Sequence, residues 1–339
     1  MTSKARCLAA IRGDVADRVP VFPLLMLLAA DRAGISYREY ATNGSALAQA
    51  QLQVRERYGL DAITACSDAF RIVADLGAEM AFPDDKPPYA HRPLIAGRSD
   101  LAWLPRPDPT QTGSRMADRV AAVAELSRSA GDECLVVGWI DMPFAEACSA
   151  CGLSEFMMML VLEPALAHSI LEFMTSIVIE FARAQLQTDA PMIGAGDAAA
   201  SLISPAMYRE FALPYEQQVA AAVHDAGGLL KLHICGNTSA LLGDMAQSGG
   251  DLFDVDHMVS FEKARDVYTA AGKCYKGNLD PVTDLLQATP EQCHQRALDR
   301  LRLAEGTRFM LSAGCEIPAA VPDEVLQAFC AAPKVYAER

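Results

Sequence analysis

Short apolar segments alternate with stretches of helical character along most of this chain, and this alternation limits its possible folds more than any other feature. Eight segments have the composition of buried β-strands: residues 19–25, 62–66, 134–139, 192–196, 229–234, 252–255, 274–276 and 309–312. Strands that alternate with helices are typical of a parallel sheet. Eight units in 339 residues favour a closed (β/α)8 TIM barrel over an open doubly wound sheet. No glycine-rich dinucleotide motif follows the first segment, which also weighs against the open sheet.

The segments between the strands complete the expected domain. Helices are predicted over residues 1–18, 45–58, 113–130, 153–162, 164–187, 204–226 (bent at Pro214), 239–248, 261–271 and 289–304. Residues 82–109 contain seven prolines and are too apolar for a free linker. We therefore predict one barrel domain over residues 1–339, with an N-terminal helix and a proline-rich, loop-rich insertion after the second strand that packs on the barrel.

Composition and charge exclude several classes of function. Hydrophobic residues make up 51% of the chain, so a large core can form. The net charge of −14 disfavours binding to nucleic acid. The N-terminal sequence lacks the apolar core of a signal peptide, and apolar segments such as residues 22–30 and 156–162 are too short to span a membrane. Ten cysteines without the spacing of small secreted domains then indicate reduced thiols in a cytoplasmic protein.

The sequence LLKLHICG at residues 229–236 holds the most specific chemical signal. Because side chains alternate along a strand, His233 and Cys235 are expected to point to the same side. A second apolar segment leads into Cys315. One imidazole and two thiolates suit Zn²⁺, and three protein ligands leave the open position that is typical of a catalytic zinc. Asp256, or Asp254 beside it, is a candidate fourth ligand. The alternative is that the histidine and the cysteines only fill the core.

Other polar side chains also gather at the predicted carboxyl ends of strands, where a β/α barrel places its active site. Asp68 and Asp197 are candidate catalytic residues, and Asn278 and Glu316 are candidate contacts for substrate or cofactor. Each aspartate has the alternative role of capping the helix that follows it. Met26 and Trp139 lie where they either line the pocket or belong to the core.

These residues resemble the uroporphyrinogen decarboxylase superfamily over nearly the whole chain. The resemblance is carried by the segments DRVPV (17–21), CSDAF (66–70), LISP (202–205), FALPY (211–215), GNLDP (277–281) and GCEIP (314–318). Within this superfamily, the chain is similar to the cobalamin-dependent methyltransferase branch. That branch carries a His-x-Cys pair and a later cysteine as zinc ligands, which match His233, Cys235 and Cys315. True decarboxylases carry an arginine-rich segment after the first strand, but residues 24–32 are mostly apolar here and contain one arginine.

The resemblance implies a (β/α)8 barrel that binds Zn²⁺ and works with a corrinoid on a partner protein. The expected reaction is methyl transfer from a small donor, such as a methoxy-aromatic ether, to cob(I)alamin, with Asp197 near the leaving oxygen. The reverse chemistry, from methylcobalamin to a thiol, is the alternative direction. A decarboxylase that depends on Asp68, and a barrel that only binds a corrinoid protein, are the competing classes. A homodimer is one assembly open to the chain.

Overall fold

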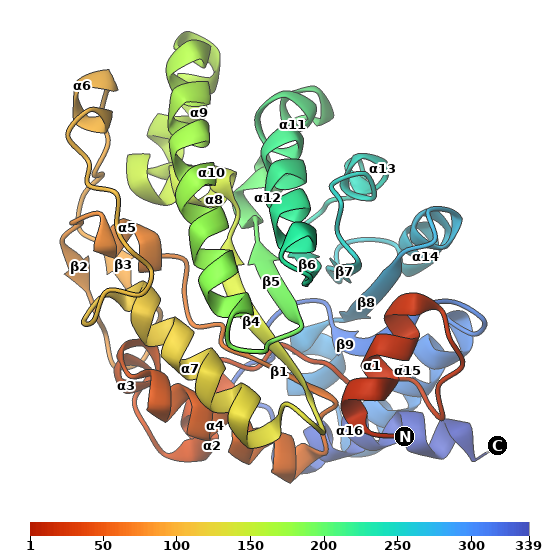
Figure 1. Ribbon diagram of the computed structural model, residues 1–339. Helices are drawn as coiled ribbons and strands as arrows, with labels where there is room; N and C mark the ends of the chain where they lie inside the picture. The colour runs from red at the N-terminus through yellow and green to blue at the C-terminus, as the bar shows by residue number, and fades with distance from the viewer. Residues whose placement is uncertain (339) are drawn as a thin grey trace.

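The computed structural model describes residues 1–338, and its centre is a curled sheet of seven parallel strands (Figure 1). The strands follow one another in the order β1-β4-β5-β6-β7-β8-β9. Their bounds are β1 (Ala62–Thr64), β4 (Leu135–Asp141), β5 (Met192–Gly196), β6 (Leu229–His233), β7 (Leu252–Val255), β8 (Cys274–Leu279) and β9 (Phe309–Ala313). Since neighbours in the sheet are also neighbours in the chain, every connection is one β/α unit or a longer version of it.

The chain segment around Val21 closes the sheet into a barrel. Val21 forms a parallel bridge with Leu311 of β9, and its carbonyl accepts a hydrogen bond from the Asp61 N–H at 3.0 Å. The segment therefore lies between β9 and β1. The prediction of a full strand over residues 19–25 is wrong in its extent, because Pro20 and Pro23 lack the N–H groups that a longer ladder requires. The barrel expected from the sequence is nevertheless confirmed.

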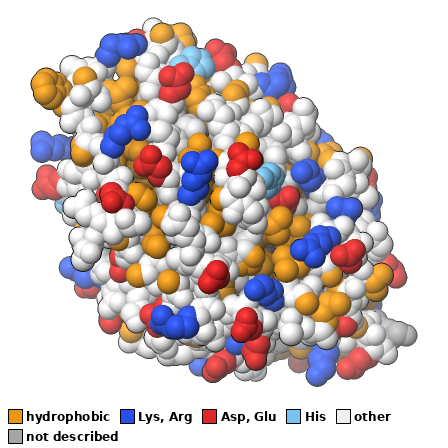
Figure 2. Space-filling model, in the orientation of Figure 1, with side chains coloured by type: hydrophobic (Ala, Val, Ile, Leu, Met, Phe, Trp, Pro, Cys, Tyr) orange, Lys and Arg blue, Asp and Glu red, His pale blue; other side chains and the backbone are white. Residues whose placement is uncertain are grey.

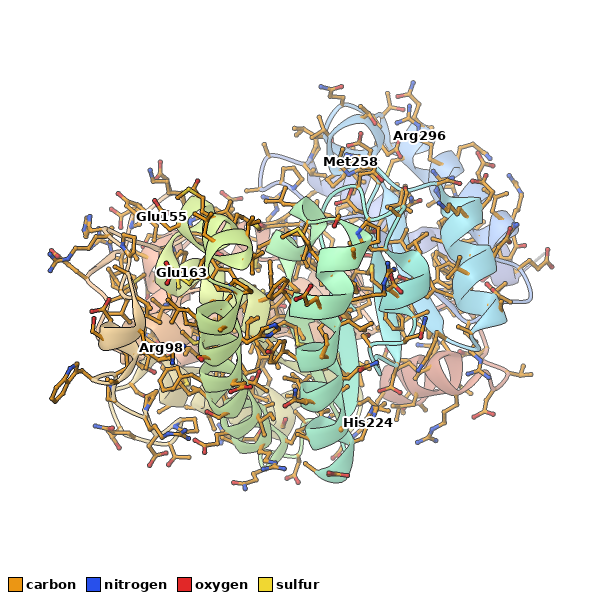
Figure 3. All side chains as sticks on the ribbon, turned by 90° about the horizontal axis from the view of Figure 1, so that it is seen from above. Arg98, Glu155, Glu163, His224, Met258 and Arg296 are labelled. Carbon is orange, nitrogen blue, oxygen red and sulfur yellow. The ribbon has the colours of Figure 1, made fainter. Side chains whose placement is uncertain are left out.

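Helices surround the sheet. Those predicted from the sequence are α1 (Ser3–Arg12), α4 (Gly44–Tyr58), α7 (Arg115–Ala130), α9 (Leu153–Leu162), α10 (Pro164–Leu186), α11 (Pro205–Phe211), α12 (Leu213–Asp225), α13 (Leu242–Met245), α14 (Phe261–Ala270) and α15 (Pro290–Leu303). Seen from above, Glu163 between α9 and α10, His224 on α12 and Arg296 on α15 follow one another around the sheet (Figure 3). α11 and α12 meet at Ala212, so the bend predicted beside Pro214 is a break between two helices.

Several helices differ from the prediction or were absent from it. α1 ends at Arg12 rather than near residue 18, because Gly13 takes the left-handed conformation (φ 81°) that ends helices. α13 covers four residues where a longer helix was expected. Helices absent from the prediction are α2 (Leu27–Ala33), α3 (Tyr37–Thr42), α5 (Arg71–Asp75), α6 (Arg98–Leu101), α8 (Pro143–Cys151) and α16 (Asp323–Ala337), with the short turns η1 (Ala198–Leu202) and η2 (Pro281–Leu286).

The proline-rich insertion begins directly after β2 (Met80–Ala81), which pairs antiparallel with β3 (Tyr89–Ala90) inside it, and α6 follows. The backbone N–H groups of Leu94 and Ile95 both donate to the carbonyl of Ala150 on α8, at 2.7 and 3.1 Å. The Ile95 side chain is fully buried. These contacts attach the insertion to the helix that follows β4.

α10 is long and apolar enough to cross a membrane by length and composition, as is the bent pair α8–α9. α10 instead packs against α12, α8 and β4, and its buried face includes Ile170, Met174 and Phe181. It is a core helix of the barrel. On the face shown in Figure 2, acidic and basic side chains are interspersed between small apolar patches.

Candidate metal centre

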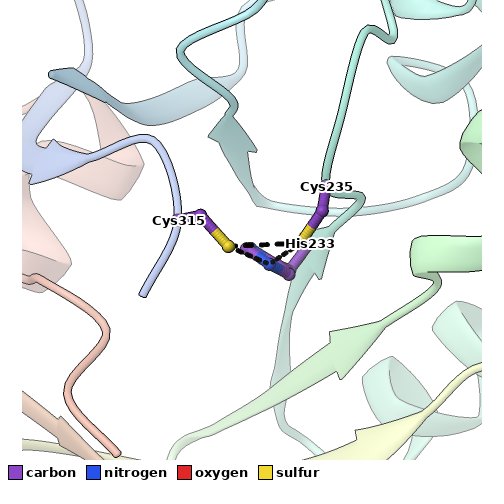
Figure 4. A group of neighbouring side chains, drawn as sticks. All are labelled: His233, Cys235 and Cys315. Carbon is purple, nitrogen blue, oxygen red and sulfur yellow. Dashed lines mark hydrogen bonds between the residues drawn. The ribbon is translucent and has the colours of Figure 1, made fainter. Parts of the chain in front are cut away.

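His233, Cys235 and Cys315 meet at the carboxyl ends of β6 and β9 (Figure 4). His233 is the last residue of β6, and Cys235 follows two residues later. Cys315 lies two residues beyond the end of β9. The Nε2 atom of His233 lies 2.8 Å from Cys235 Sγ and 4.0 Å from Cys315 Sγ, and the two sulfur atoms are 3.4 Å apart. The three residues predicted as zinc ligands are thus brought together.

The donor set and its spacing fit zinc. With ordinary Zn–S and Zn–N bond lengths, the edges of a tetrahedral site measure about 3.5 to 3.8 Å. The three observed separations, 2.8, 3.4 and 4.0 Å, lie around this value, so small side-chain shifts would place all three atoms on one ion. One imidazole and two sulfurs leave one tetrahedral position for a substrate atom.

The pKa values of the two cysteines in this site are shifted in opposite directions. Hydrogen bonds from Cys235 and from His233 lower the pKa of Cys315 well below that of an ordinary thiol. Sharing a hydrogen bond with Cys315 raises the pKa of Cys235 in turn. A divalent cation beside the two sulfurs would favour the thiolate form of both cysteines.

A buried carboxylate orients the histidine. Asp254 on β7 accepts from His233 Nδ1 at 2.6 Å, and the same oxygen lies 2.7 Å from Lys231 Nζ and 3.3 Å from Lys276 Nζ. Burial alone would raise the pKa of Asp254, but the charges of the two lysines outweigh it and hold that pKa well below its usual range. With Nδ1 protonated toward Asp254, a metal ion that displaces the Nε2 proton would find the Nε2 lone pair directed at the site of the cysteines. Asp254 is thus a positioning residue.

Asp256, the predicted fourth ligand, shapes the loops that carry the cysteines. One oxygen accepts from the Gly236 N–H and the other from the Met258 N–H, both at 2.9 Å. At Gly314, beside Cys315, an added Cβ would lie 2.3 Å from the His257 nitrogen. The two loops therefore need a glycine to approach this closely. Asp256 is outside the group of ligand atoms that lie within 4.8 Å of one another, and its role as a ligand stays a prediction.

A cavity of about 730 Å³ opens beside Cys235 and Gly236. Much of its lining is apolar, and it includes Phe70, Leu153 and Leu202, with several alanines from α8 and η1. The basic side chains on its wall are His91 and Arg92, from the insertion. The cavity is large enough for a substituted aromatic ring, and its apolar wall would bind such a ring beside a metal ion.

Asp68 lies behind the cavity in a dense ionic network. Arg115 donates to both of its oxygens, at 2.8 and 2.9 Å, and Ser67 and the Phe70 N–H donate as well. Burial would raise the pKa of Asp68, but the charge of Arg115 outweighs this effect and holds the pKa well below its usual range. With these donors on both oxygens, its catalytic role stays a prediction.

Asp197 lies at the end of β5 but is fully buried and outside the lining of the cavity. Its backbone N–H donates to the His233 carbonyl at 2.9 Å. Burial, and next the carboxyl of Glu216 on α12, raise its pKa well above the ordinary value. Tyr208 donates to Glu216 Oε2. The two acids form a buried pair behind the strand end, so the proposed contact of Asp197 with a leaving oxygen is a prediction for which the structure gives no open path.

The four candidate contact residues divide into two groups. Trp139 lies in the barrel interior, with its ring centroid 6.1 Å from that of His233, and Met26 packs beside it. Asn278 and Glu316 instead hold loops. Asn278 donates to the carbonyls of Asp256 and Val259, at 3.2 and 2.8 Å, and Glu316 accepts from the Leu27 N–H at 2.7 Å. Burial raises the pKa of Glu316 to about 7.

Three inward-facing residues are not among those predicted from the sequence: Lys231, Lys276 and Asp141. The two lysines interrupt apolar strands, in LLKLH and CYKGN, and a lysine in the middle of a barrel strand is a signal that could have been used. In the strand register, Asp141 of β4 lies beside Gly196 of β5, which lies beside His233 of β6. Asp141 therefore faces the metal centre across Gly196. Arg71 donates to it at 2.6 Å. Burial raises the pKa of Asp141 to about 6.

Comparison with known proteins agrees with this architecture. The family description "Uroporphyrinogen decarboxylase (URO-D)" matches residues 2–336. The chain belongs to the uroporphyrinogen decarboxylase family. Among its relatives is a uroporphyrinogen decarboxylase of Nocardia farcinica, 30% identical over 84% of this chain and 78% of the relative. Another, from Nostoc punctiforme, is 27% identical over 94% of this chain and 92% of the relative.

Solved structures of methyltransferases resemble this chain. A methyltransferase from Methanosarcina mazei superposes with a TM-score of 0.89 and 25% identity, over 99% of both chains. A B12-independent methionine synthase from Shewanella shares the fold alone, with a TM-score of 0.56 and 12% identity over 87% of this chain and 86% of that one. The fold of this chain is therefore similar to that of solved methyltransferases, while its sequence relatives are named as decarboxylases.

Proposed function

We propose that this protein is a zinc-dependent methyltransferase that passes a methyl group from a small O-methyl or S-methyl compound to cob(I)alamin on a partner protein. The observation that carries the proposal is the convergence of His233, Cys235 and Cys315 beside an apolar cavity. The likeness to a methyltransferase over 99% of both chains supports it. When bound, zinc would supply Lewis-acid polarisation of the oxygen or sulfur that carries the methyl group.

The remaining work falls to the residues of this chain. Asp254 keeps His233 oriented, and Asp256 fixes the turn after Cys235. The apolar cavity wall excludes water and orients the body of the donor so that its methyl group faces the barrel mouth. An apolar wall suits an aryl methyl ether better than a highly charged donor. This preference supports the donor-side direction over the reverse transfer to a thiol.

Decarboxylation of a porphyrinogen, the activity named for several relatives, fits the site less well. The cavity wall carries Arg92 and His91 as its basic side chains, too few to bind many carboxylates. Asp68, which such a reaction would require, is bound on both oxygens by Arg115. A decarboxylase would also leave the paired cysteines without a task.

The test is carried out anaerobically with zinc-loaded protein and chemically reduced free cobalamin. The donors are a panel of aryl methyl ethers and methyl thioethers. We expect at least one donor to convert the visible spectrum of cob(I)alamin to that of methylcobalamin, and we expect Cys315→Ser to lose this activity. Methylcobalamin with 2-mercaptoethanol tests the reverse direction. If Cys315→Ser retains full activity, or if no donor and no acceptor reacts while a porphyrinogen is decarboxylated, the proposal is wrong.

A further inference from the structure

Two lysines and one aspartate occupy the barrel interior directly beneath the metal centre. Lys231, Asp254 and Lys276 come from the adjacent strands β6, β7 and β8, and each is at most 4% exposed. One oxygen of Asp254 lies 2.7 Å from Lys231 Nζ and 3.3 Å from Lys276 Nζ. Lys276 also donates to Ser312 Oγ at 3.1 Å. We call these three residues the lysine cluster.

The lysine cluster has a surplus of positive charge, because one carboxylate faces two ammonium groups. Aromatic faces partly compensate for it. Lys231 Nζ lies 4.7 Å from the Trp139 ring centroid, and Lys276 Nζ lies 4.9 Å from the Phe22 ring centroid. Burying a charge is costly, and apolar residues of similar size would fill a barrel at least as stably. Packing alone therefore does not account for two lysines in this layer.

The metal centre provides a reason for the surplus. A divalent cation with two thiolates and a neutral imidazole has no net charge. An anion at the fourth position would make the centre negative, and His233 links this centre to the cluster through Asp254 at 2.6 Å. In a buried, weakly screened setting, the positive cluster then stabilises the centre when it holds an anion and does little when it holds a neutral ligand.

We propose that the lysine cluster, Lys231, Asp254 and Lys276, stabilises an anionic oxygen or sulfur at the open ligand position. This anion is the demethylated form of the substrate, and the cluster favours its binding over that of the neutral methylated form. This inference rests on the proposed function. In the transfer, the C–O or C–S bond breaks and its electron pair stays on the heteroatom, while the methyl carbon bonds to cobalt(I) through the cobalt electron pair. The negative charge appears on the heteroatom, and the lysine cluster would stabilise this charge.

The experiment measures ligand selectivity, independently of methyl transfer. The protein is loaded with Co²⁺ in place of zinc, and visible spectra report the binding of phenol and 2-mercaptoethanol as anions. Anisole and 2-(methylthio)ethanol are the neutral comparators, and the phenol and thiol arms distinguish oxygen from sulfur. Lys276→Met and Lys231→Met remove one charge each and keep an unbranched chain. Lys263→Met, at an exposed lysine of α14, is the matched control.

We expect each cluster variant to bind the anions at least tenfold more weakly while neutral ligands change less than twofold, and we expect Lys276→Arg to restore most of the affinity. Equal losses for anions and neutral ligands, or no loss, would overturn the inference. Wild-type protein must itself bind phenol more tightly than anisole, and because the metal alone also favours an anion, the contribution of the cluster is the part of this selectivity that the lysine variants lose. If metal binds and this selectivity is present but no methyl transfer is detected, the proposed function is wrong while the inference about the lysine cluster stands. If methyl transfer occurs without selectivity, the inference fails alone.

Discussion

The Nδ1 atom of His233 lies 2.6 Å from an oxygen of Asp254, on the strand next to its own. This hydrogen bond fixes the tautomer in which Nε2 can bind a metal. We therefore predict that Asp254→Asn weakens zinc binding by about 10- to 100-fold, as the loss of a supporting carboxylate usually does. Competition with a chromophoric chelator measures the affinity. Asp266→Asn, at an exposed aspartate of α14, should leave it unchanged. An unaltered affinity in Asp254→Asn would show that the carboxylate does not orient the ligand.

Asp68 anchors the ionic network behind the cavity, so its replacement should first affect stability. Asp68→Asn leaves the Arg115 and Arg71 guanidinium groups without a full countercharge, which costs about 3 kcal/mol for buried pairs. Urea unfolding at pH 7 measures this loss. Because the folded pKa of Asp68 is depressed, its contribution is present above about pH 4 and is lost as the pH falls. The wild-type and variant curves should therefore converge in acid. Loss of activity with unchanged stability would instead support the catalytic role.

The buried pair of Asp197 and Glu216 predicts a stability change of the opposite sign. Burial raises the pKa of Glu216 to about 7, against about 4.3 in an unfolded chain. The folded state therefore binds the extra proton, and stability falls by on the order of 3 kcal/mol as the pH rises from about 4.3 to 7. Glu216→Gln should flatten this slope. Urea unfolding at pH 5 and pH 8, with a chelator present to remove the metal contribution, is the measurement. A slope as steep as that of wild type would contradict the assignment.

Trp139 depends on the absence of a side chain at Gly194. A Cβ at Gly194 would lie 2.6 Å from the Trp139 ring and 3.2 Å from Lys231 Cε. Gly194→Ala should displace the ring and destabilise the protein by about 1 to 3 kcal/mol. Trp139 can be observed alone once the exposed Trp103 is replaced by Phe. In that background we expect altered tryptophan emission for Gly194→Ala and unchanged emission for Gly243→Ala, where an added Cβ would meet no side chain of residues 1–338 within 4 Å. Identical spectra would contradict the tight packing.

Much of the fold could be predicted because the period of the apolar residues is local information. Seven of the eight predicted strands form the sheet, and most of the long helices begin and end within two residues of the prediction. The first strand was predicted too long, although Pro20 and Pro23 limit its ladder in the sequence itself. Only the tertiary structure shows that Val21 bridges to β9 and accepts a hydrogen bond from Asp61, next to β1. The helix at the C-terminus, α16, is absent from the prediction, although ten of its residues precede Pro333 without a helix-breaking residue.

The metal triad was predictable for a similar reason. Alternation along a strand places His233 and Cys235 together, and the barrel brings the ends of β6 and β9 toward a common centre. The roles of the aspartates were not predictable, because they depend on partners that are distant in sequence. Asp68 meets Arg115, Asp197 meets Glu216, and Asp256 meets Gly236. A position at the end of a strand indicates where in the fold an aspartate lies, but not which hydrogen-bond donor or second acid its carboxyl group contacts.

Zinc content per chain after exhaustive dialysis tests the central claim most directly. We predict about one zinc per wild-type chain, with most of it lost in Cys235→Ser and in Cys315→Ser. Cys330→Ser, which alters a half-buried cysteine of α16, should retain the full amount. Circular dichroism of each variant establishes that it is folded. A folded wild-type protein that retains no zinc, or cysteine variants that retain as much as wild type, would contradict the account.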